Sequence, residues 1–375
     1  MRQAPASDPP SSVVDSLIGK EIRKAKLLVT DRCNLGCPYC YVSDRGRDMS
    51  WPVARNAVEL LLRSGGEDKL ISLFGGEPLL NFGLIERIAP YARKRAEALG
   101  KKLVLSMITS ASILKPSHLS FLREQRVRVA VSLGGVREDH DAYRLFRGGG
   151  GSYESARRIL PALFEALGPE KAGVSFCVLP STVERLRRNF LHLLSLGFRY
   201  FNFEIIQDFE PWTPGHAEIF LEQAERLLRD CLEGVEGGDP IYVNSVNWEL
   251  ARKRLSASLG VQCPFNYLLR VYPGGELVFS HSAMNDSDGQ RYVFGNLASG
   301  ELRSYGRCAF DADAADCRSC VIDYFAGRRF DRGASLIHGA LQQLSLKMAE
   351  HVLRRAPTDR RYRRYAEKTR EDVLF

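Results

Sequence analysis

The sequence predicts an α/β protein whose main domain is a partial barrel of six β/α units, followed by a smaller C-terminal domain. Apolar segments suited to strands alternate six times with segments of helical periodicity before residue 238. The apolar segments are nearly continuous, as in parallel strands buried on both faces. Six units are too few for a closed eight-stranded barrel. We therefore expect a partial (β/α)6 TIM-like barrel with its chemistry at the carboxyl ends of the strands.

The predicted strands are short and rich in branched apolar residues, and they cover 25–30, 69–74, 102–109, 127–133, 172–179 and 200–206. The predicted helices have apolar residues at helical spacing, and they cover 51–65, 82–99, 115–125, 152–167, 182–196 and 214–233. Ser152 and Thr182 are suited to cap the N-termini of two of these helices. Strands that alternate with helices predict a parallel sheet with right-handed crossovers.

Four segments follow from changes in this pattern. Residues 1–22 are rich in Pro and Ser and are expected to form a disordered tail, whereas 23–238 form the barrel. The alternation stops near residue 240, and a hairpin with Pro273-Gly274-Gly275 as its turn follows within a small domain at 239–330. Residues 331–375 are expected to form a helix and a basic tail.

Composition narrows the class of protein. No run of the 375 residues approaches the roughly 20 apolar residues that cross a bilayer, and the N-terminus does not resemble a signal peptide. This predicts a cytoplasmic protein without a membrane partner, in which nine cysteines favour metal or redox chemistry over disulfides. The net charge is +8, and Tyr362 and Tyr365 interleave with a basic C-terminal stretch. A nucleic-acid contact is conceivable there, but a solvated basic helix is the favoured interpretation.

A cysteine triplet directly follows the first predicted strand. Cys33, Cys37 and Cys40 are spaced CxxxCxxC, and four thiolates would be needed to saturate a 4Fe–4S cluster. Three ligands leave one iron open, which is a reactive arrangement rather than a structural one. A zinc site using Cys37, Cys40 and remote ligands is the alternative, and the three-residue first gap argues against it.

The stretch CNLGCPYC resembles the signature of radical S-adenosylmethionine (radical SAM) enzymes, with Tyr39 at the aromatic position. The resemblance implies a 4Fe–4S cluster whose open iron binds S-adenosylmethionine. It also implies cleavage to a 5′-deoxyadenosyl radical, which removes a hydrogen atom from the substrate. An electron donor such as flavodoxin or ferredoxin is implied as a partner. In such enzymes the cofactor carries the difficult chemistry and the protein positions it.

Two further motifs support this resemblance. Gly75-Gly76-Glu77-Pro78, at the end of the second predicted strand, is similar to the family's GGEP motif, which contacts the methionine amino group. Ser132 and Arg144 match the SLDG…HDxxR pattern of the peptide-modifying branch. There the serine touches the cofactor and the arginine pairs with its carboxylate, a task that suits a guanidinium group. The alternative is a turn serine and a surface ion pair.

The sequence departs from the family at two strand ends. Gly134 stands where relatives often have aspartate, and Thr109-Ser110-Ala111 stands where many have Thr-Asn-Gly. At Gly134 the resemblance therefore implies no ribose contact.

A second group of cysteines lies in the C-terminal domain. Cys263, Cys308, Cys317 and Cys320 are enough to saturate one further cluster. The stretch from Cys263 to Gly275 resembles the opening of a SPASM domain, but Ser280 occupies the position of a further cysteine. The resemblance therefore implies the shortened twitch form with one auxiliary 4Fe–4S cluster. A zinc site made by the same thiolates is the alternative.

The branch resemblance implies hydrogen abstraction from a peptide or protein residue, as in anaerobic sulfatase maturases and enzymes that crosslink, oxidise or epimerise ribosomal peptides. A precursor peptide would then be the substrate, and a separate leader-binding protein is a conceivable partner. Glu204 and Asp208, at the end of the sixth strand, are candidate proton acceptors, the alternative being solvated loop carboxylates. Two other functions are a radical SAM dehydrogenase or cyclase for a small molecule, and a non-catalytic Fe–S or zinc protein that binds nucleic acid.

Overall fold

The computed structural model describes residues 22–206, 209–247, 250, 268–278, 293–301 and 332–372. Its centre is one sheet whose six consecutive strands β1 to β6 are parallel and neighbour each other in chain order. They are β1 (Lys24–Thr30), β2 (Asp68–Gly75), β3 (Lys102–Thr109), β4 (Val127–Ser132), β5 (Ala172–Val178) and β6 (Tyr200–Ile205). The predicted strands and their parallel order are confirmed.

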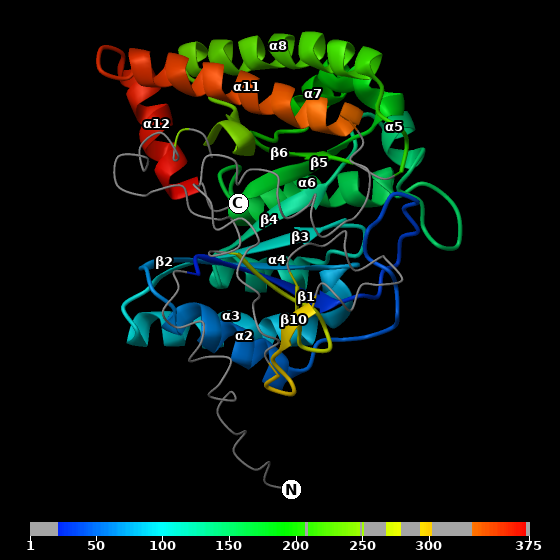
Figure 1. Cartoon of the computed structure of the whole chain (residues 1–375), viewed down its shortest axis with the longest axis vertical. Coiled ribbons are helices and arrows are strands. Elements are labelled where there is room, and N and C mark those ends of the chain that lie inside the picture. The colour runs from blue at the N-terminus through cyan, green and yellow to red at the C-terminus, as the bar shows by residue number, and fades with distance from the viewer. Residues whose placement is uncertain are drawn as a thin grey trace, which may run out of the picture.

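The helices between the strands pack on one face of this sheet, as Figure 1 shows for α2 and α3 at one end and α7 and α8 at the other. They are α2 (Trp51–Arg63), α3 (Phe82–Ala98), α4 (Pro116–Glu124), α6 (Tyr153–Leu167), α7 (Leu186–Ser195) and α8 (Pro214–Gly237). The helix predicted at 182–196 is divided, because a 3-10 helix at Pro180–Arg185 precedes α7. One-sided cover by helices is the arrangement of a partial barrel.

The sheet extends beyond the six strands at both edges. The short β7 (Tyr242–Val243) pairs with β6, while β8 (Leu268–Val271) pairs in parallel with β1. The strands β9 (Glu276–Val278) and β10 (Val293–Asn296) continue antiparallel from β8. The hairpin predicted at Pro273-Gly274-Gly275 is therefore confirmed, and it prolongs the barrel sheet.

Side chains alternate between the two faces of each strand. On β1, Ala25, Leu27 and Val29 belong to the main core beneath the helices, whereas Leu28 belongs to a small second cluster with Phe74 and Tyr272. Lys24 and Lys26 share the face of Leu28 by this alternation. The inner face of the barrel is therefore polar along part of its length.

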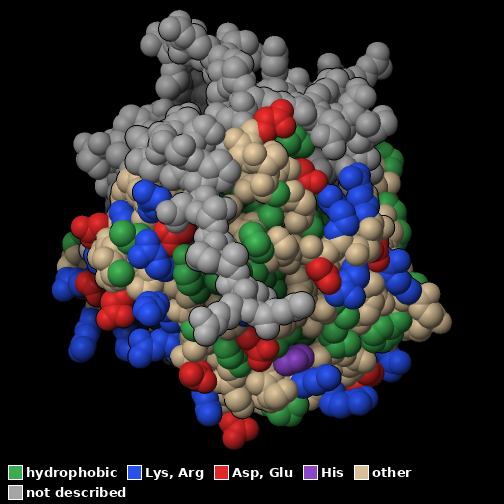
Figure 2. Space-filling model, turned by 90° about the horizontal axis from the view of Figure 1, so that it is seen from below, with side chains coloured by type: hydrophobic (Ala, Val, Ile, Leu, Met, Phe, Trp, Pro, Cys, Tyr) green, Lys and Arg blue, Asp and Glu red, His purple; other side chains and the backbone are tan. Residues whose placement is uncertain are grey.

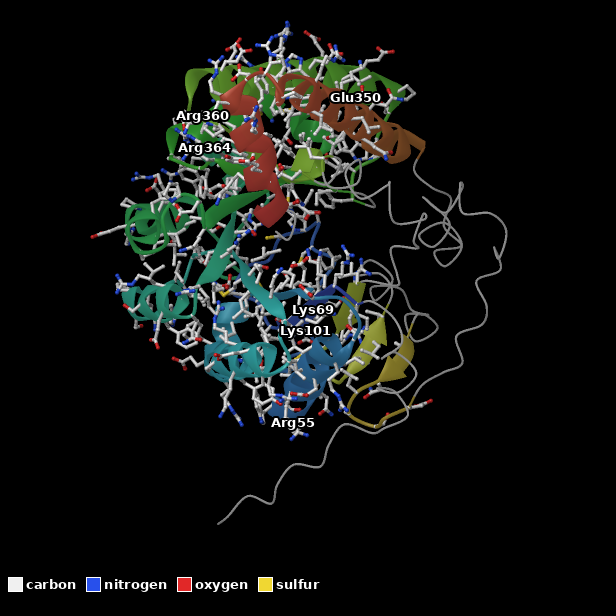
Figure 3. The ribbon with its side chains drawn as sticks, turned by 90° about the vertical axis from the view of Figure 1, so that its left-hand side faces the viewer. Arg55, Lys69, Lys101, Glu350, Arg360 and Arg364 are labelled. Atoms are coloured by element: carbon white, nitrogen blue, oxygen red, sulfur yellow. The ribbon has the colours of Figure 1, made fainter. Side chains whose placement is uncertain are left out.

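The C-terminal end of α2 is held by two lysines that Figure 3 labels. Lys69 is fully buried, and its Nζ donates to the Ile22 carbonyl at 2.6 Å, the Ser64 hydroxyl at 2.8 Å and the Gly65 carbonyl at 2.6 Å. Lys101 Nζ donates to the Gly66 carbonyl at 2.8 Å from the surface. A buried ammonium with three acceptors satisfies carbonyls that a helix end leaves open.

Two C-terminal helices, α11 (Arg332–Arg355) and α12 (Arg360–Asp372), pack against α8. Tyr362 and Tyr365 are buried, and the Tyr365 ring stacks on Tyr242 with centroids 4.8 Å apart. These two rings are therefore not available to stack on nucleic-acid bases. Arg360 and Arg364 lie exposed on α12 in Figure 3. On the different face that Figure 2 shows, acidic side chains lie among the basic ones. No helix within the described ranges combines the length and apolarity needed to cross a membrane.

We predict that Lys69→Ala lowers the free energy of unfolding by about 2–4 kcal/mol, because three buried acceptors lose their donor. Lys101→Ala is the matched control, and we expect it to cost less than about 1 kcal/mol because that ammonium lies near solvent. Chemical denaturation of both variants measures the difference. Equal losses in the two variants would contradict the role given to the buried lysine.

Candidate active site

The cysteine triplet lies on the loop between β1 and α2, at the carboxyl end of the sheet. The Leu35 amide donates to Cys33 Sγ at 3.4 Å, and the Val42 amide donates to Cys40 Sγ at 3.4 Å. Hydrogen bonds to the sulfur atoms of ligating cysteines shift the reduction potential of an iron–sulfur cluster. Burial raises the pKa of Cys33 to about 11 and also raises the pKa of Cys40. A thiolate at these positions therefore needs a cation beside it, as a metal ligand has.

Within the described ranges, no three Cys, His, Asp or Glu side chains converge closely enough to hold a metal ion. This includes Cys33, Cys37 and Cys40. Their ligation of one cluster stays a prediction from the sequence motif.

The glycines of the GGEP motif are required by close backbone contacts. A Cβ on Gly75 would lie 2.3 Å from the Thr30 carbonyl oxygen, and one on Gly76 would lie 2.3 Å from the Arg32 carbonyl oxygen. The amides of Gly76 and Glu77 donate to those same two carbonyls at 2.9 Å. The end of β2 thus holds the start of the cysteine loop by its backbone.

Glu77 is fully buried, and its carboxylate joins the ends of β2 and β3. It accepts the Thr109 hydroxyl at 2.6 Å, the Ser110 hydroxyl at 2.6 Å, the Ser110 amide at 2.8 Å and the Leu79 amide at 3.2 Å. Two carboxylate oxygens offer about four acceptor sites, so these donors use the whole capacity of the group.

Thr109-Ser110-Ala111 stands where many relatives have Thr-Asn-Gly, and its third residue still adopts a backbone conformation that glycine favours. Ala111 has a φ of 58°, in the left-handed region. Ser112, which follows, accepts from Asn34 Nδ2 at 2.9 Å and so links this loop to the cysteine loop. Asn34 Oδ1 is buried and has no hydrogen-bond partner within the described part of the chain. This oxygen can accept a hydrogen bond from a group bound beside the triplet.

Arg144 lies at the other side of the cysteine loop. Its Nη1 donates to the Tyr39 hydroxyl at 2.8 Å, and its buried Nε has no partner among the described residues. The Tyr39 ring packs near Tyr143 and Phe209, with centroids 6.1 and 6.2 Å away. Burial raises the pKa of Tyr39, so the phenol stays neutral and can accept from the guanidinium.

Residues 145–147 run along the cysteine loop and are joined to it by backbone contacts. The Gly36 amide donates to the Leu145 carbonyl at 2.8 Å, and the Arg147 amide donates to the Asn34 carbonyl at 3.2 Å. Arg147 Nε also donates to the Cys33 carbonyl at 2.8 Å. Sequence reasoning missed this contact, because nothing in the motif marks Arg147.

A buried histidine shapes the loop that carries Arg144. The Gly134 amide donates to His140 Nδ1 at 3.2 Å, so His140 Nε2 carries the proton and donates to Ser152 Oγ at 2.9 Å. Ser152 in turn donates to the Arg144 carbonyl at 2.6 Å. A Cβ on Gly134 would lie 3.3 Å from His140 Cα, which gives a physical reason for glycine at this departure from the family pattern.

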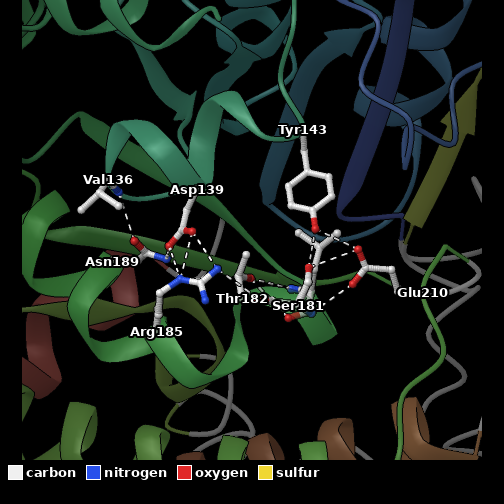
Figure 4. A network of polar contacts seen from close by, with 9 residues as sticks. Val136, Asp139, Tyr143, Ser181, Thr182, Arg185, Asn189 and Glu210 are labelled. Atoms are coloured by element: carbon white, nitrogen blue, oxygen red, sulfur yellow. Dashed lines mark hydrogen bonds and ion pairs between the residues drawn. The ribbon is translucent and has the colours of Figure 1, made fainter.

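Figure 4 shows how the same loop is joined to residues that follow β5 and β6. The Arg185 guanidinium pairs with Asp139 at 2.8 Å, and Asn189 Nδ2 donates to Asp139 at 2.8 Å. Tyr143 donates to Glu210 at 2.9 Å and also contacts the Ser181 hydroxyl. These contacts fix Tyr143 and, through it, the neighbouring Arg144.

The remaining predicted residues lie at the same end of the sheet or outside the described ranges. Ser132 ends β4 as the register partner of Ser175 on β5. Glu204 is exposed on β6 and accepts from Asn202 Nδ2 at 2.6 Å. Asp208, Cys263, Cys308, Cys317 and Cys320 lie outside the described residues, so nothing here bears on them.

Cys177, which stands alone in an apolar segment of the sequence, is only half-buried and lies on the inner face of β5. Its pKa is raised to about 11, chiefly by burial, and the Tyr39 hydroxyl and Arg144 are among the groups that act on it. The alternation of β5 was the signal that could have placed it beside the site.

Asn34 lies within the triplet and Arg144 contacts Tyr39 of the same loop, and the Asn34 Oδ1 acceptor and the Arg144 Nε donor have no partner within the described residues. An amino acid carries an ammonium that needs an acceptor and a carboxylate that needs a donor. The described residues therefore fit the amino-acid part of S-adenosylmethionine beside a cluster at the triplet.

Comparison with known proteins defines the class of this site. Residues 27–202 match the model of the Radical SAM superfamily, so this part of the chain is a radical SAM domain. The chain is 27% identical over 223 residues to an uncharacterized protein of Methanocaldococcus jannaschii, which covers 59% of this chain and 73% of that protein. It is 33% identical over 150 residues to GTP 3′,8-cyclase of Pelotomaculum thermopropionicum, covering 38% of this chain and 44% of the cyclase.

Two solved structures share the fold of this chain. anSMEcpe with bound AdoMet and Cp18Cys peptide has a TM-score of 0.63 at 16% identity, covering 88% of this chain and 99% of that chain. Streptococcus suis SuiB bound to precursor peptide SuiA has a TM-score of 0.50 at 13% identity, covering 74% and 63%. Both are SPASM/twitch-type radical SAM enzymes, and the chain shares their fold.

We predict that His140 makes stability pH-dependent. Burial, together with Arg144, lowers its pKa from 6.5 to about 3 in the folded protein, where Ser152 and the Tyr153 ring also face it. Between those pH values the unfolded state binds a proton that the folded state does not, so the free energy of unfolding falls as the pH drops through 6.5. From pH 7.5 to 5.5 the loss should be about 1.4 kcal/mol larger in the native protein than in His140→Gln.

Anaerobic urea titrations at the two pH values measure this difference. The other histidines are common to both proteins and cancel in the comparison. The same pH-dependent loss in both proteins would contradict the lowered pKa of His140 in the folded protein.

Proposed function

We propose that this protein is a radical SAM enzyme that removes a hydrogen atom from a residue of a peptide, giving a crosslinked, oxidised or epimerised ribosomal peptide. The observation that carries the proposal is the shared fold with peptide-bound anSMEcpe, which extends over 88% of this chain. SuiB, whose structure contains its precursor peptide, supports the same substrate class. The net charge of +8 suits an acidic partner.

Cys33, Cys37 and Cys40 would hold the 4Fe–4S cluster, with Tyr39 beside it in the same loop. With S-adenosylmethionine bound, the cluster would supply reductive cleavage and hydrogen-atom abstraction. Asn34 would accept from the methionine ammonium, and the Arg144 Nε would donate to the carboxylate, because each atom is buried without a partner within the described residues. Ser132 would contact the cofactor from the end of β4.

We assign Glu77 a positioning role. Four donors already occupy its carboxylate, so it would hold the ends of β2 and β3 in place rather than pair directly with the ammonium. Gly75 and Gly76 would act in the same way, by letting the backbone approach the cysteine loop.

Several finer points belong to the same proposal. Glu204 and Asp208 are candidate proton acceptors for the substrate, and a flavodoxin or ferredoxin would supply electrons in the cytoplasm. A separate leader-binding protein would deliver the precursor peptide. The second cysteine group would hold one auxiliary 4Fe–4S cluster in a twitch-like domain.

A cyclase or dehydrogenase acting on a small molecule is the second candidate. The 33% identity to GTP 3′,8-cyclase favours it, but the chain spans only 44% of that enzyme. Incubation with GTP and analysis of the products tests this candidate directly.

We predict that the anaerobically reconstituted protein forms 5′-deoxyadenosine from S-adenosylmethionine under a strong reductant. Cys37→Ala should abolish this product, because two thiolates cannot hold the cluster with one open iron. Cys231→Ala is the control, since that thiol is fully buried beneath the sheet, away from the loop. Unimpaired cleavage by Cys37→Ala would contradict the assignment.

The substrate class is tested by co-expression with short peptides encoded beside the gene. Mass spectrometry should find loss of two hydrogens for a crosslink or oxidation, or deuterium uptake from D2O for an epimerisation. Modified peptide must be absent with Cys37→Ala. Conversion of GTP, with no peptide modified, would favour the second candidate.

We predict about eight irons per chain after reconstitution, which corresponds to two cubes. Cys317→Ala should remove about half of this iron and leave the absorbance of the first cluster intact. Stoichiometric zinc in anaerobically purified protein would instead identify the second cysteine group as a zinc site.

A further inference from the structure

Residues 144–152 form a small hairpin beside the cysteine loop. An antiparallel bridge joins Leu145 to Gly151 across this hairpin. At its base, the Arg144 carbonyl accepts from the Ser152 amide at 3.2 Å and from the Ser152 hydroxyl at 2.6 Å. The backbone of Arg144 is therefore fixed as the first residue of the hairpin.

One side of the hairpin pairs with the part of the cysteine loop between Cys33 and Cys37. Leu35 and Phe146 form an antiparallel bridge there, with a backbone hydrogen bond between the two segments on either side of it. The hairpin therefore lies along the first half of the triplet as a neighbouring strand would.

The Arg147 side chain contacts both ends of the segment that carries the triplet. Its Nε donates to the Cys33 carbonyl at 2.8 Å, and its Nη2 pairs with the Asp44 carboxylate at 2.7 Å. The stem of the side chain lies against Gly36, where an added Cβ would be 3.8 Å from Arg147 Cγ. The Asp44 carboxylate also accepts the Gly46 amide at 2.9 Å, so it is held in place. Since Cys33 and Asp44 enclose all three cysteines, one guanidinium closes the whole segment.

The contacts of Arg147 fix geometry more than they stabilise the fold. The side chain is 52% exposed, and ion pairs at such positions contribute little to the free energy of unfolding. A planar guanidinium that binds two acceptors at once nevertheless specifies where the two acceptors lie relative to each other. Burial raises the pKa of Cys40, and Arg144 and Arg147 are two of the groups that oppose this rise, so both cations lie within electrostatic reach of the triplet.

We propose that Arg147 is a positioning residue, which holds the cysteine loop at the separation from Arg144 that S-adenosylmethionine has to span. The inference rests on the proposed function, since it concerns the cofactor of that same site. Arg144 begins the hairpin strand and contacts Tyr39 within the triplet at 2.8 Å, and Arg147 ends the paired part of that strand. The amino-acid part of the cofactor must meet the triplet and Arg144 together, and a misplacement of about 1 Å can cost roughly 100-fold.

The test uses the anaerobically reconstituted holoenzyme. Calorimetry gives the Kd for S-adenosylmethionine, and 5′-deoxyadenosine formation at saturating cofactor gives kcat. We expect Arg147→Gln to raise the Kd by about 10- to 100-fold, as when a hydrogen-bond partner behind a metal ligand is removed. Iron content should match that of the native protein, and kcat should be nearly unchanged, which is the pattern of weakened ground-state binding.

Arg157→Gln is the matched control. The Arg157 side chain is 51% exposed and pairs with Glu154 at 3.1 Å within α6, so a half-exposed ion pair is lost there too. This variant should bind S-adenosylmethionine as tightly as the native protein. Equal weakening in Arg157→Gln and Arg147→Gln would overturn the role given to Arg147.

Two further variants test the clamp itself. Asp44→Asn removes one end of it and should weaken binding, while Arg147→Gln combined with Asp44→Asn should bind no more weakly than Arg147→Gln alone, because both changes break the same ion pair. Arg147→Lys keeps the charge and can keep one of the two hydrogen bonds, so it should recover part of the affinity. Additive losses in the double variant would contradict the clamp.

Hydrogen exchange of the peptide that contains Gly36 follows the loop independently of catalysis, and it should be faster in Arg147→Gln than in the native protein. If Arg147→Gln keeps the native Kd, or loses iron instead of affinity, the positioning role is wrong while the proposed function stands. If the native protein binds S-adenosylmethionine but forms no 5′-deoxyadenosine, the proposed function fails, and the comparison of Kd values still decides the role of Arg147.

Discussion

The backbone contact between the end of β2 and the start of the cysteine loop is the constraint on which the candidate site depends. Two amides and two carbonyls meet there, and the approach is so close that any side chain at Gly75 or Gly76 would overlap the opposing carbonyl. Glu77, immediately afterwards, ties the end of β3 to the same point. Three consecutive residues thus bring together the carboxyl ends of three parallel strands, and the cysteine loop begins at that junction.

On the opposite side, the loop after β4 is held by a different kind of interaction. A neutral histidine, an aspartate–arginine pair and a tyrosine form polar contacts that reach residues following β5 and β6. Polar networks of this kind specify one arrangement of a loop when every member has a partner. The network leaves Arg144 with one committed nitrogen and one uncommitted nitrogen. Many contacts of the network therefore serve to position one edge of the Arg144 guanidinium.

Much of this architecture could be predicted from the sequence, because periodicity and motif order are local signals. The six parallel strands, the hairpin at Pro273 and the placement of the cysteine loop are confirmed. The sequence could not reveal that the Glu77 carboxylate accepts hydrogen bonds from Thr109 and Ser110, since these bonds depend on which strand ends meet. The lysines of β1 were hidden for a related reason, because a run such as AKLLVT looks apolar until its alternation is assigned to an inner and an outer face. Tyr362 was misjudged because its neighbours are basic, while its own position on α12 faces the core.

The pairing of β8 with β1 has a consequence for how the protein is made. Lys24 finds its partner at Leu268, so one edge of the first strand has no mate until about 240 further residues have left the ribosome. At 5–20 residues per second, this interval lasts roughly 12 to 50 s. An open parallel edge is a template for pairing with other chains. Lysines at positions 24 and 26 lie on that edge, and their charge would discourage such pairing during synthesis. The same side chains would then act first as protection for a nascent strand and later as the lining of the finished barrel.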